Sequence, residues 1–378
     1  MNNLYLIDTR GNLDVKKSDV VERHIIYAKH FDKKCASRGQ EGKIIVLGRY
    51  GSSSDFNSRY LDIINISRSK GLPAYIWRAR KYLAQQKADT LTLIAGDPWH
   101  STLTALIIQI TLKKHICIES QLHFDYINFF HSKGFVFSRV IRAVTLIFLG
   151  RVDQIRVVDP NTFKVLQDKM KKIEKIYLAP SLSILDPTYR CSRHSESFIV
   201  PRLLFVGRLH EERNPSDFIK FLRLLDSKSF KYDARIVGDG PLMKELQQDS
   251  SDLVAREVLR FTGEVTSKKL LEEYCESDVL ISCAKHESYG RAMREALYVG
   301  ARVLSFETTG AIFLQKEVGI EYVAFVSSDV TSDKLISKIE GLIRSEVDSD
   351  TKRALLQGQR KILETLSERW DTLFNKSV

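Results

Sequence analysis

The sequence of 378 residues contains few cysteines and no long apolar run. Its five cysteines are scattered, and no two of them form a Cys-x-x-Cys pair. A structural zinc site or a disulfide framework is therefore not expected, and a reducing, cytoplasmic compartment fits best. The longest apolar stretches, 103–112 and 143–150, are shorter than the roughly 20 residues of a membrane-spanning helix. Since no basic segment with an apolar signal core opens the sequence, we expect a protein that is not integral to a membrane.

Two further absences exclude classes of function. The Gly-x-Gly-x-x-Gly fingerprint of nicotinamide dehydrogenases occurs in neither half of the sequence. No recognised nucleic-acid-binding motif or aromatic platform accompanies the basic residues either, so nucleic acid is not expected as a partner.

The positive charge is concentrated in the first half of the chain. Residues 1–190 carry 30 Lys and Arg against 17 Asp and Glu, a net charge of +13, whereas the remaining residues carry 28 against 30, a net charge of −2. This asymmetry predicts that the first half meets something anionic, such as a phospholipid surface or a phosphorylated acceptor. Ordinary solubilising charge is the alternative explanation.

Short apolar runs alternate with segments of helical periodicity along most of the chain. In the second half the runs are four to six residues long and lack polar alternation, which is typical of strands buried on both faces. This alternation predicts parallel sheets with right-handed crossovers, and hence Rossmann-like domains. The expected strands are 4–7, 44–47, 74–77, 91–95, 116–119, 155–158 and 176–179 in the first half, and 203–206, 234–237, 258–261, 279–282, 303–306 and 322–326 in the second.

The pattern predicts two domains. An aperiodic segment, 186–200, is the expected linker between an N-terminal domain, 1–185, and a C-terminal domain, 201–350. The last segment, 351–378, is expected to be helical and could return to the N-terminal domain. Ligands of such sheets bind outside the carboxyl ends of the strands, so two facing domains predict one cleft between them.

Three loops of the second half, each directly after an expected strand, suit an anionic ligand. The first holds Gly207, Arg208 and Arg213, and planar guanidinium groups can bind a diphosphate in a bidentate manner. The other two are Gly238-Asp239-Gly240-Pro241 and Phe261-Thr262-Gly263-Glu264-Val265, in which glycine permits close backbone approach. Each loop alone is common in Rossmann-like folds.

A fourth loop, Glu287-Ser288-Tyr289-Gly290-Arg291, leads into an expected helix. The N–H groups at a helix N-terminus attract anions, and a carboxylate can accept two hydrogen bonds from a sugar diol. Glu287 before the helix and Glu295 within it could therefore bind the two sugars of a nucleotide-sugar. Alternatively, Glu287 caps the helix and Glu295 pairs with a surface arginine.

In order and spacing, these four loops resemble the C-terminal domain of the family 4 retaining glycosyltransferases, which have the GT-B fold. The matching residues are Gly207 and Arg208, 238–241, 261–265, and Glu287, Gly290, Glu295 and Ala296. The resemblance is strong over about residues 202–310 and looser over the whole chain. It departs at Arg213-Asn214, where the family has Lys-Gly, and at Cys283-Ala284, where Pro-Ser is usual.

The resemblance implies an α/β protein of GT-B type, in which two facing Rossmann-like domains form an interdomain cleft. The C-terminal domain would then bind the nucleotide-sugar and the N-terminal domain the acceptor. Arg208 and Arg213 would hold the donor diphosphate, Glu287 the transferred sugar and Glu295 the ribose. The expected donor-binding residues are Gly207, Arg208, Arg213, Gly238, Glu264, Val265, Glu287, Ser288, Tyr289, Gly290, Arg291 and Glu295.

The first half resembles the same family less closely. Asp97, in the sequence Ile94-Ala95-Gly96-Asp97-Pro98, matches its Asp-Pro loop, and His123 matches its histidine at a strand end. By this resemblance His123 lies beside the transferred sugar and is a catalytic residue together with Glu287, Arg208 and Arg213. Gly11, Asp97 and His123 are the expected acceptor-side residues, although Gly11 is the single glycine in place of a glycine-rich loop.

Metal-dependent glycosyltransferases use an Asp-x-Asp triplet, and one occurs at Asp348-Ser349-Asp350. It follows an expected helix rather than a strand, so it is interpreted as the cap of the next helix. We therefore expect no metal and no cofactor other than the nucleotide-diphosphate sugar donor.

Aromatic and basic residues are mixed in the segment 133–142, which continues into the apolar stretch 143–150. This mixture favours a peripheral membrane helix, with a buried core helix as the alternative. Together with these features, the resemblance implies a metal-independent retaining glycosyltransferase of the cytoplasm, at the inner face of the plasma membrane if the anionic partner is lipid. Its acceptor would be a glycan or lipid-linked molecule of surface polysaccharide or lipopolysaccharide assembly. Another sugar-nucleotide enzyme of the same fold, such as an epimerase or phosphorylase, and a non-catalytic glycan-binding or partner-binding scaffold are the alternatives.

Overall fold

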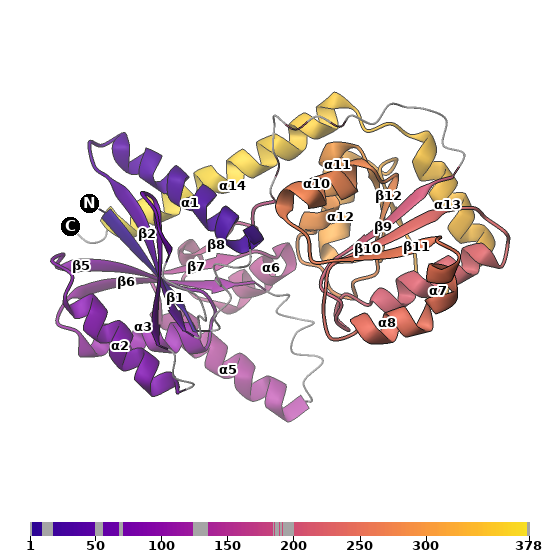
Figure 1. The fold of residues 1–378 in the computed structure, drawn as a ribbon. Helices are drawn as coiled ribbons and strands as arrows, with labels where there is room; N and C mark the ends of the chain where they lie inside the picture. The colour runs from indigo at the N-terminus through magenta and orange to yellow at the C-terminus, as the bar shows by residue number, and fades with distance from the viewer. Residues whose placement is uncertain are drawn as a thin grey trace. The chain divides into compact units, whose positions relative to one another are not determined.

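The computed structural model describes residues 2–9, 18–49, 56–67, 71–123, 135–183, 185, 189, 191 and 200–375. The chain forms two compact units, each built around its own sheet (Figure 1). Unit 1 comprises Met1–Pro180 and Arg360–Val378, and unit 2 comprises Ser181–Gln359. The long C-terminal helix α14, Ser349–Asn375, therefore contributes its first part to unit 2 and the rest to unit 1.

Unit 1 contains a sheet of eight strands in the order β3-β4-β2-β1-β5-β6-β7-β8. Its pairs are parallel except for the short antiparallel β3–β4 pair. The strands are β1 Asn2–Asp8, β2 Gly42–Arg49, β3 Phe56–Asn57, β4 Leu61–Ser67, β5 Thr90–Ala95, β6 His115–Leu122, β7 Gln154–Val157 and β8 Ile176–Leu178.

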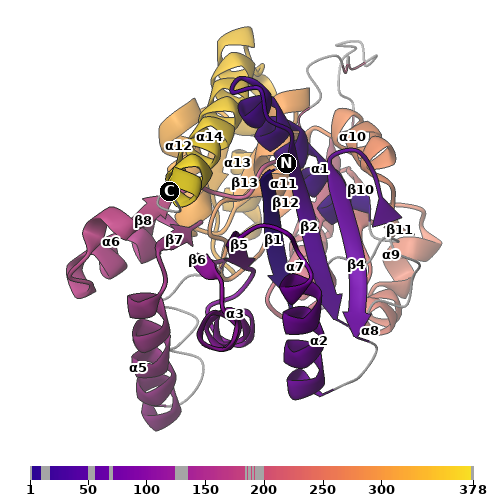
Figure 2. The ribbon, with the colours of Figure 1, turned by 90° about the vertical axis from the view of Figure 1, so that its left-hand side faces the viewer.

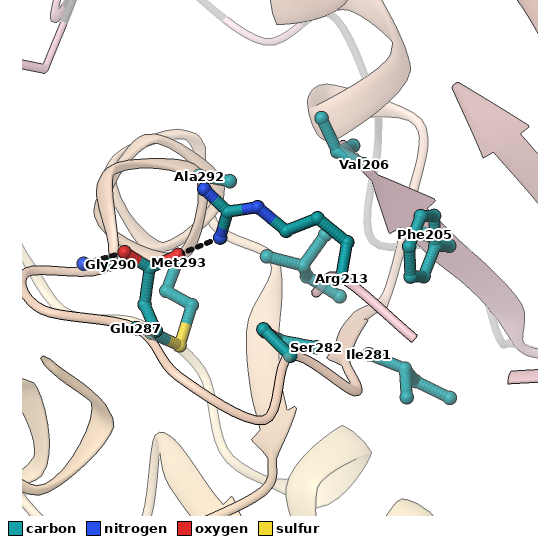
Figure 3. A pocket seen from close by; sticks show the side chains of 11 residues that line it. Phe205, Val206, Arg213, Ile281, Ser282, Glu287, Gly290, Ala292 and Met293 are labelled. Carbon is teal, nitrogen blue, oxygen red and sulfur yellow. Dashed lines mark hydrogen bonds and ion pairs between the residues drawn. The ribbon is translucent and has the colours of Figure 1, made fainter. Parts of the chain in front are cut away.

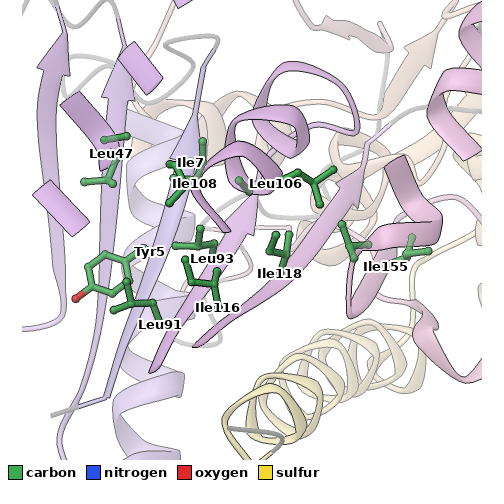
Figure 4. Packing of buried hydrophobic residues seen from close by; sticks show 14 of the residues in the cluster. Tyr5, Ile7, Leu47, Leu91, Leu93, Leu106, Ile108, Ile116, Ile118 and Ile155 are labelled. Carbon is green, nitrogen blue, oxygen red and sulfur yellow. The ribbon is translucent and has the colours of Figure 1, made fainter. Parts of the chain in front are cut away.

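Helices cover both faces of this sheet. One side carries α1 and the end of α14, and the other carries α2, α3 and α5 (Figures 1 and 2). Figure 4 shows apolar side chains of the central strands, such as Ile7, Leu93 and Ile118, packed in one cluster with Leu106 and Ile108 of α3. The helices are α1 Ser18–Ala36, α2 Leu72–Ala84, α3 His100–Thr111, α5 Phe135–Arg151 and α6 Pro160–Lys169, with a short 3-10 turn at Ile173–Lys175.

The expectation of a strand at 74–77 is wrong, because these residues lie within helix α2. Tyr75, Ala79 and Leu83 are the buried residues of this helix, and their spacing of four places them on one face. Pro73 stands in the first turn of the helix, where a missing N–H costs nothing. The strand that precedes this helix along the chain is β4.

Unit 2 contains a parallel sheet of six strands in the order β11-β10-β9-β12-β13-β14. All six strands expected from the apolar runs of this half are confirmed to within two residues at either end. The strands are β9 Arg202–Val206, β10 Asp233–Val237, β11 Leu259–Gly263, β12 Val279–Ser282, β13 Arg302–Ser305 and β14 Val323–Phe325. The helices are α7 Pro215–Asp226, α8 Met243–Asp249, α9 Ser251–Ala255, α10 Ser267–Cys275, α11 Arg291–Val299, α12 Thr309–Val318 and α13 Ser332–Arg344.

The cysteines correct one expectation. Cys191 and Cys275 form a disulfide in unit 2, whereas the scattered spacing of the five cysteines argued against a disulfide framework. The two residues are 84 positions apart, so only the fold brings them together. Cys35, Cys117 and Cys283 are free and buried.

Candidate functional site

The first three loops of unit 2 meet at the carboxyl edge of its sheet. The N–H of Gly207 donates to the carbonyl of Val237, at 3.0 Å, and that of Gly238 to the carbonyl of Gly263, at 2.9 Å. Gly238 has a φ of +133°, and a Cβ there would lie 2.0 Å from the carbonyl oxygen of Gly207. Glycine is therefore required where the first two loops touch, and the backbones of three neighbouring strands form one continuous edge.

The fourth loop brings its carboxylate to this edge. A small pocket with a cavity volume of about 20 Å³ lies between β9, β12 and the start of α11. In it the guanidinium of Arg213 pairs with Oε2 of Glu287, and the N–H of Gly290 donates to Oε1 of Glu287 at 3.2 Å (Figure 3). A cation, an anion and a helix N-terminus thus share one small site.

Local backbone geometry explains how these groups converge. Asn214 adopts a left-handed conformation with φ +51° directly after Arg213, and helix α7 then begins at Pro215. Gly290 has φ +75° at the N-cap of α11, and a Cβ there would lie 2.2 Å from the Cε of Met293. The sharp turn at Gly290 directs its own N–H, immediately before α11, to the carboxylate of Glu287.

The charge state of Glu287 is set by two opposing effects. Burial raises the pKa of this carboxyl. This increase is outweighed by the lowering that comes from the charge and hydrogen bond of Arg213, the N–H of Gly290 and the charge of Arg291. The net pKa is below the ordinary value for glutamate. Glu287 conversely raises the pKa of the Arg213 guanidinium. The pair is therefore ionised, and a diphosphate that approached the partly exposed Arg213 would meet a cation already held in place.

A buried arginine supports the fourth loop from behind. Arg294 on α11 is 1% exposed, lies 4.1 Å from the centroid of the Tyr289 ring and pairs with Glu317 of α12 at 2.7 Å. The amide of Gln359 donates to the hydroxyl of Tyr289 at 3.3 Å. These contacts hold the side chain of Tyr289 in place within the fourth loop.

The sequence analysis missed one loop beside Glu287. The N–H of Gly310 donates to the carbonyl of Glu287 at 2.7 Å, and a Cβ at Gly310 would lie 2.8 Å from the backbone of Tyr289. The hydroxyl of Thr308 caps helix α12 by accepting from the N–H of Ala311. The signal was available, because Thr308-Thr309-Gly310 also follows directly after an expected strand.

Other expected donor residues lie outside the pocket. Glu295 is buried on α11, where its Oε2 accepts a hydrogen bond from the hydroxyl of Tyr274 at 3.2 Å. The partner in this contact is therefore a buried tyrosine and not a surface arginine. Arg208 is exposed on the first loop, and Glu264 is exposed after β11. Val265 packs against the apolar cluster around α10 and α11. The structure thus brings Arg213, Glu287 and Gly290 together, while the other residues surround them along the same four loops.

In unit 1, Asp97 and His123 follow the paired strands β5 and β6 and therefore lie at one edge of the sheet. The carboxylate of Asp97 is buried and accepts hydrogen bonds from the hydroxyls of Ser101 and Thr9, at 2.6 and 3.2 Å, and from the N–H of Trp99. These bonds give Asp97 a role in holding the start of α3. Gly11 lies outside the described residues.

His123 ends a row of polar side chains along β6. Its Nε2 lies 2.9 Å from Oε1 of Gln121, whose amide nitrogen donates to Oε1 of Glu119 at 2.9 Å. Glu119 is completely buried, and its other oxygen accepts from the hydroxyl of Tyr177 at 2.7 Å. Burial raises the pKa of Glu119, although these hydrogen bonds oppose the increase. The imidazole is exposed, but a buried network anchors it.

The Asp-x-Asp triplet caps a helix, as expected. The N–H of Thr351 donates to Oδ1 of Asp348 at 2.6 Å at the start of α14, and Asp350 pairs with Arg353. The hydroxyl of Tyr322 donates to the other oxygen of Asp348. Both carboxylates therefore have partners within the protein.

Comparison with known proteins finds similarity to a family in the second half of the chain. Residues 200–358 match the sequence model of the family described as glycosyl transferases group 1. An uncharacterised 41.2 kDa protein in the cps region of Klebsiella pneumoniae is 27% identical over 137 residues, 35% of this chain and 36% of that protein. A GalNAc-alpha-(1->4)-GalNAc-alpha-(1->3)-diNAcBac-PP-undecaprenol alpha-1,4-N-acetyl-D-galactosaminyltransferase of Campylobacter jejuni is 30% identical over 156 residues, 41% of each chain. These matches thus span about two fifths of the curated relatives.

Solved structures resemble the chain over its whole length. Sucrose-phosphate synthase from Thermosynechococcus elongatus has a TM-score of 0.75 at 13% identity, with 100% of each chain covered. Anabaena HepE in complex with UDP and glucose has a TM-score of 0.67 at 12% identity, with 97% of this chain and 100% of that chain covered. At these identities the similarity concerns the fold.

The two Rossmann-like units have the fold of GT-B glycosyltransferases, and the second carries a cation–carboxylate site at its strand ends. Within that unit, residues 200–358 are similar to the glycosyl transferases group 1 family.

Proposed function

We propose that the protein transfers a sugar from a nucleotide-diphosphate sugar to a glycan or lipid-linked acceptor, with retention of anomeric configuration and without a metal ion. The observation that carries the proposal is the ion pair of Arg213 and Glu287 beside the N-terminus of α11. This site offers positive charge for a diphosphate and a carboxylate for sugar hydroxyls within one pocket.

In the proposed reaction the residues of unit 2 stabilise the leaving group. Arg208, Arg213 and the N–H groups of α11 bind the diphosphate, on which negative charge grows as the bond to the anomeric carbon breaks. Glu287 holds the hydroxyls of the transferred sugar. The acceptor hydroxyl then bonds to the anomeric carbon on the same face, and its proton passes to the leaving phosphate. His123 of unit 1 is proposed as a further catalytic residue because it resembles the family's histidine at a strand end.

The nature of donor and acceptor is proposed from relatives. HepE was solved with UDP and glucose, and the Campylobacter jejuni relative is named for a lipid-linked acceptor. The Klebsiella pneumoniae relative is encoded in a cps region. We therefore propose a role in surface polysaccharide or lipopolysaccharide assembly, in the cytoplasm at the inner face of the plasma membrane, with a contact between the basic N-terminal half and anionic lipid.

A panel of UDP-sugars and GDP-sugars tests the proposal. Purified protein is incubated with each donor, and release of the nucleoside diphosphate is measured with and without oligosaccharide or lipid-linked acceptors. One donor should be hydrolysed slowly alone and consumed faster with an acceptor, and the Glu287→Gln variant should lose both activities. Free epimerisation or phosphorolysis would favour another sugar-nucleotide enzyme. If calorimetry detects no binding of UDP or GDP, the protein is a non-catalytic scaffold.

A further inference from the structure

The carboxyl edge of the sheet in unit 2 continues beyond the pocket around Glu287, here called the donor pocket. The N–H of Phe306, after β13, donates to the carbonyl of Ser282 at 3.0 Å. The N–H of Val326, after β14, donates to the carbonyl of Ser305 at 2.9 Å. The loops after β12, β13 and β14 therefore lie side by side. Parallel sheets bind ligands at this end of their strands, and the proposed reaction gives the loop after β14 no role.

An open pocket with a volume of about 1160 Å³ lies over these loops and the first two turns of α13, and is here called the β14 pocket. Part of its lining is apolar and comes from Phe306, Phe325, Val326 and Val330. The ring of Phe306 packs against that of Phe221 on α7 in a T-shaped arrangement, with the centroids 6.2 Å apart, which holds it in place. Pockets for small molecules have volumes of about 300–1,000 Å³ and are mainly apolar, so a small molecule fits here.

The loop after β14 is held in its conformation by contacts with its surroundings and within itself. The ammonium group of Lys220 on α7 donates to the carbonyl of Ser328, and the N–H of Val330 donates to the carbonyl of Ser327 at 3.2 Å. A hydrogen bond from the side chain of Ser327 lowers the pKa of the Asp329 carboxyl. Because the wall of the β14 pocket is already ordered, a ligand loses less free energy in ordering it.

The polar part of the lining carries charges of both signs. Three lysines face three acidic residues, so the net charge of the lining is zero. Ser337 on α13 adds an exposed hydroxyl. Ammonium groups donate hydrogen bonds, carboxylates accept them and hydroxyls do both. The charged residues of the lining are Lys285, Lys334, Lys338, Glu307, Asp329 and Asp333.

From this combination we infer that the β14 pocket is a second saccharide site of unit 2. A pyranose ring has apolar faces of C–H groups and a rim of hydroxyls that both donate and accept. It therefore matches aromatic side chains surrounded by ammonium groups and carboxylates. A nucleotide or a free phosphate fits less well, because its binding requires an excess of positive charge that the three acidic residues remove.

The β14 pocket shares two loops with the donor pocket. Lys285 lies two positions before Glu287, and Glu307 lies three positions before Gly310. The N–H of Gly310 in turn donates to the carbonyl of Glu287 at 2.7 Å. The bound saccharide unit would belong to the acceptor or product glycan, and this part of the inference rests on the proposed sugar transfer.

Saturation-transfer NMR with the methyl glycosides of glucose, galactose, N-acetylgalactosamine and glucuronic acid tests the inference on the whole chain. At least one glycoside should bind the wild type. Ser337→Trp should abolish this binding, because its indole would fill the pocket from an exposed position of α13. Phe325→Leu keeps an apolar contact but removes the ring, and should weaken binding about two- to tenfold. Ser251→Trp makes the same change as the first variant at an exposed position of α9, outside the pocket, and should bind like the wild type.

The opposite results are equally specific. Binding of none of the four glycosides, or equal loss in Ser337→Trp and Ser251→Trp, would overturn the inference. If Glu287→Gln abolished binding and Ser337→Trp did not, the glycoside would occupy the donor pocket and the inference would fail. Displacement of the glycoside by UMP in the wild type but not in Glu287→Gln would lead to the same conclusion.

A transfer assay tests the link to the acceptor. Ser337→Trp should raise the KM for a long acceptor glycan about tenfold while kcat stays near the wild-type value, as expected for the loss of binding that does not change during the reaction. An unchanged KM in this variant would show that the acceptor does not reach the β14 pocket. The two proposals can fail separately, because the glycoside assay uses no sugar donor. Glycoside binding without donor consumption would refute only the sugar transfer, and transfer without glycoside binding would refute only the second site.

Discussion

The Oε1 atom of Gln121 lies 2.9 Å from the Nε2 atom of His123, and the opposite end of the same amide is held by Glu119. Because the carboxylate of Glu119 accepts from the amide nitrogen of Gln121, the amide oxygen must face His123. His123 therefore carries its hydrogen on Nε2. A residue placed at the reaction centre by resemblance alone thus has a defined orientation and protonation site.

We expect Gln121→Met to leave the fold intact but to release the imidazole of His123. Long-range ¹⁵N–¹H NMR of the histidine rings should show a single Nε2–H tautomer in the wild type and two exchanging tautomers in the variant. If His123 acts in transfer, kcat should fall on the order of tenfold, with little change in the KM for the donor. Gln109→Met is the control, since the amide of Gln109 binds the carbonyl of Ile116 instead. An unchanged His123 spectrum in Gln121→Met would contradict the assignment.

Arg213→Met should lower kcat/KM for the donor by about 10²–10³-fold, because it removes a cation from the growing charge of the leaving diphosphate. Initial rates of nucleoside diphosphate release measure the effect. Arg223→Met provides the comparison, since Arg223 is an exposed arginine on α7 that pairs with Asp252. If both variants lost activity equally, the loss would reflect general charge or folding rather than the pocket.

The lowered pKa of Glu287 makes a prediction about stability and pH. A carboxyl whose pKa is depressed by folding stabilises the protein above its unfolded pKa, and this contribution is lost as the pH falls through the folded pKa. In Arg213→Met the burial that raises the pKa remains while the main opposing charge is gone. The deficit in melting temperature of Arg213→Met relative to wild type should therefore be largest near neutral pH and shrink as the pH falls and Glu287 becomes protonated. In Arg213→Met/Glu287→Gln this pH dependence of the deficit should vanish, and its persistence would assign the effect to another group.

The use of Asp348 and Asp350 as a helix cap predicts that metal removal has no effect on transfer. EDTA treatment should leave the rate of donor consumption unchanged, because both carboxylates already have protein partners. Loss of activity with EDTA, followed by its recovery on addition of a divalent cation, would show that a metal acts at the donor after all.

The strands of unit 2 could be predicted because burial on both faces imposes short, continuous apolar runs. Strand β4, Leu61–Ser67, was missed because Asp62 and Asn65 interrupt its apolar pattern, and 74–77 was mistaken for a strand because four residues do not distinguish the two periodicities. The edge at which the four loops meet also followed from sequence, since ligands of parallel sheets bind at strand ends.

Side-chain pairing could not be predicted in the same way. Arg213 and Glu287 are 74 positions apart, and their ion pair depends on the left-handed turns at Asn214 and Gly290. Glu295 shows the converse case. From its position within α11, a sugar hydroxyl or a surface arginine was the expected partner. In the folded protein the buried carboxylate instead accepts a hydrogen bond from the hydroxyl of Tyr274 on α10. Sequence spacing identifies the loop that carries a group, while rotamers and neighbouring elements decide which group it contacts.

The contact between Gly207 and Gly238 predicts a large loss of stability in Gly238→Ala. The added Cβ would lie 2.0 Å from the carbonyl oxygen of Gly207, and the φ of +133° is itself unfavourable for alanine. Together these effects should lower the free energy of unfolding by about 3 kcal/mol or more, measured by urea denaturation. Gly341→Ala is the matched control, because Gly341 lies inside helix α13 with no heavy atom within 4 Å of its added Cβ. That variant should gain about 0.5–1 kcal/mol, since alanine favours a helix over glycine. A Gly238→Ala protein as stable as the wild type would show that the first two loops can separate, and hence that the edge beneath the pocket is not rigid.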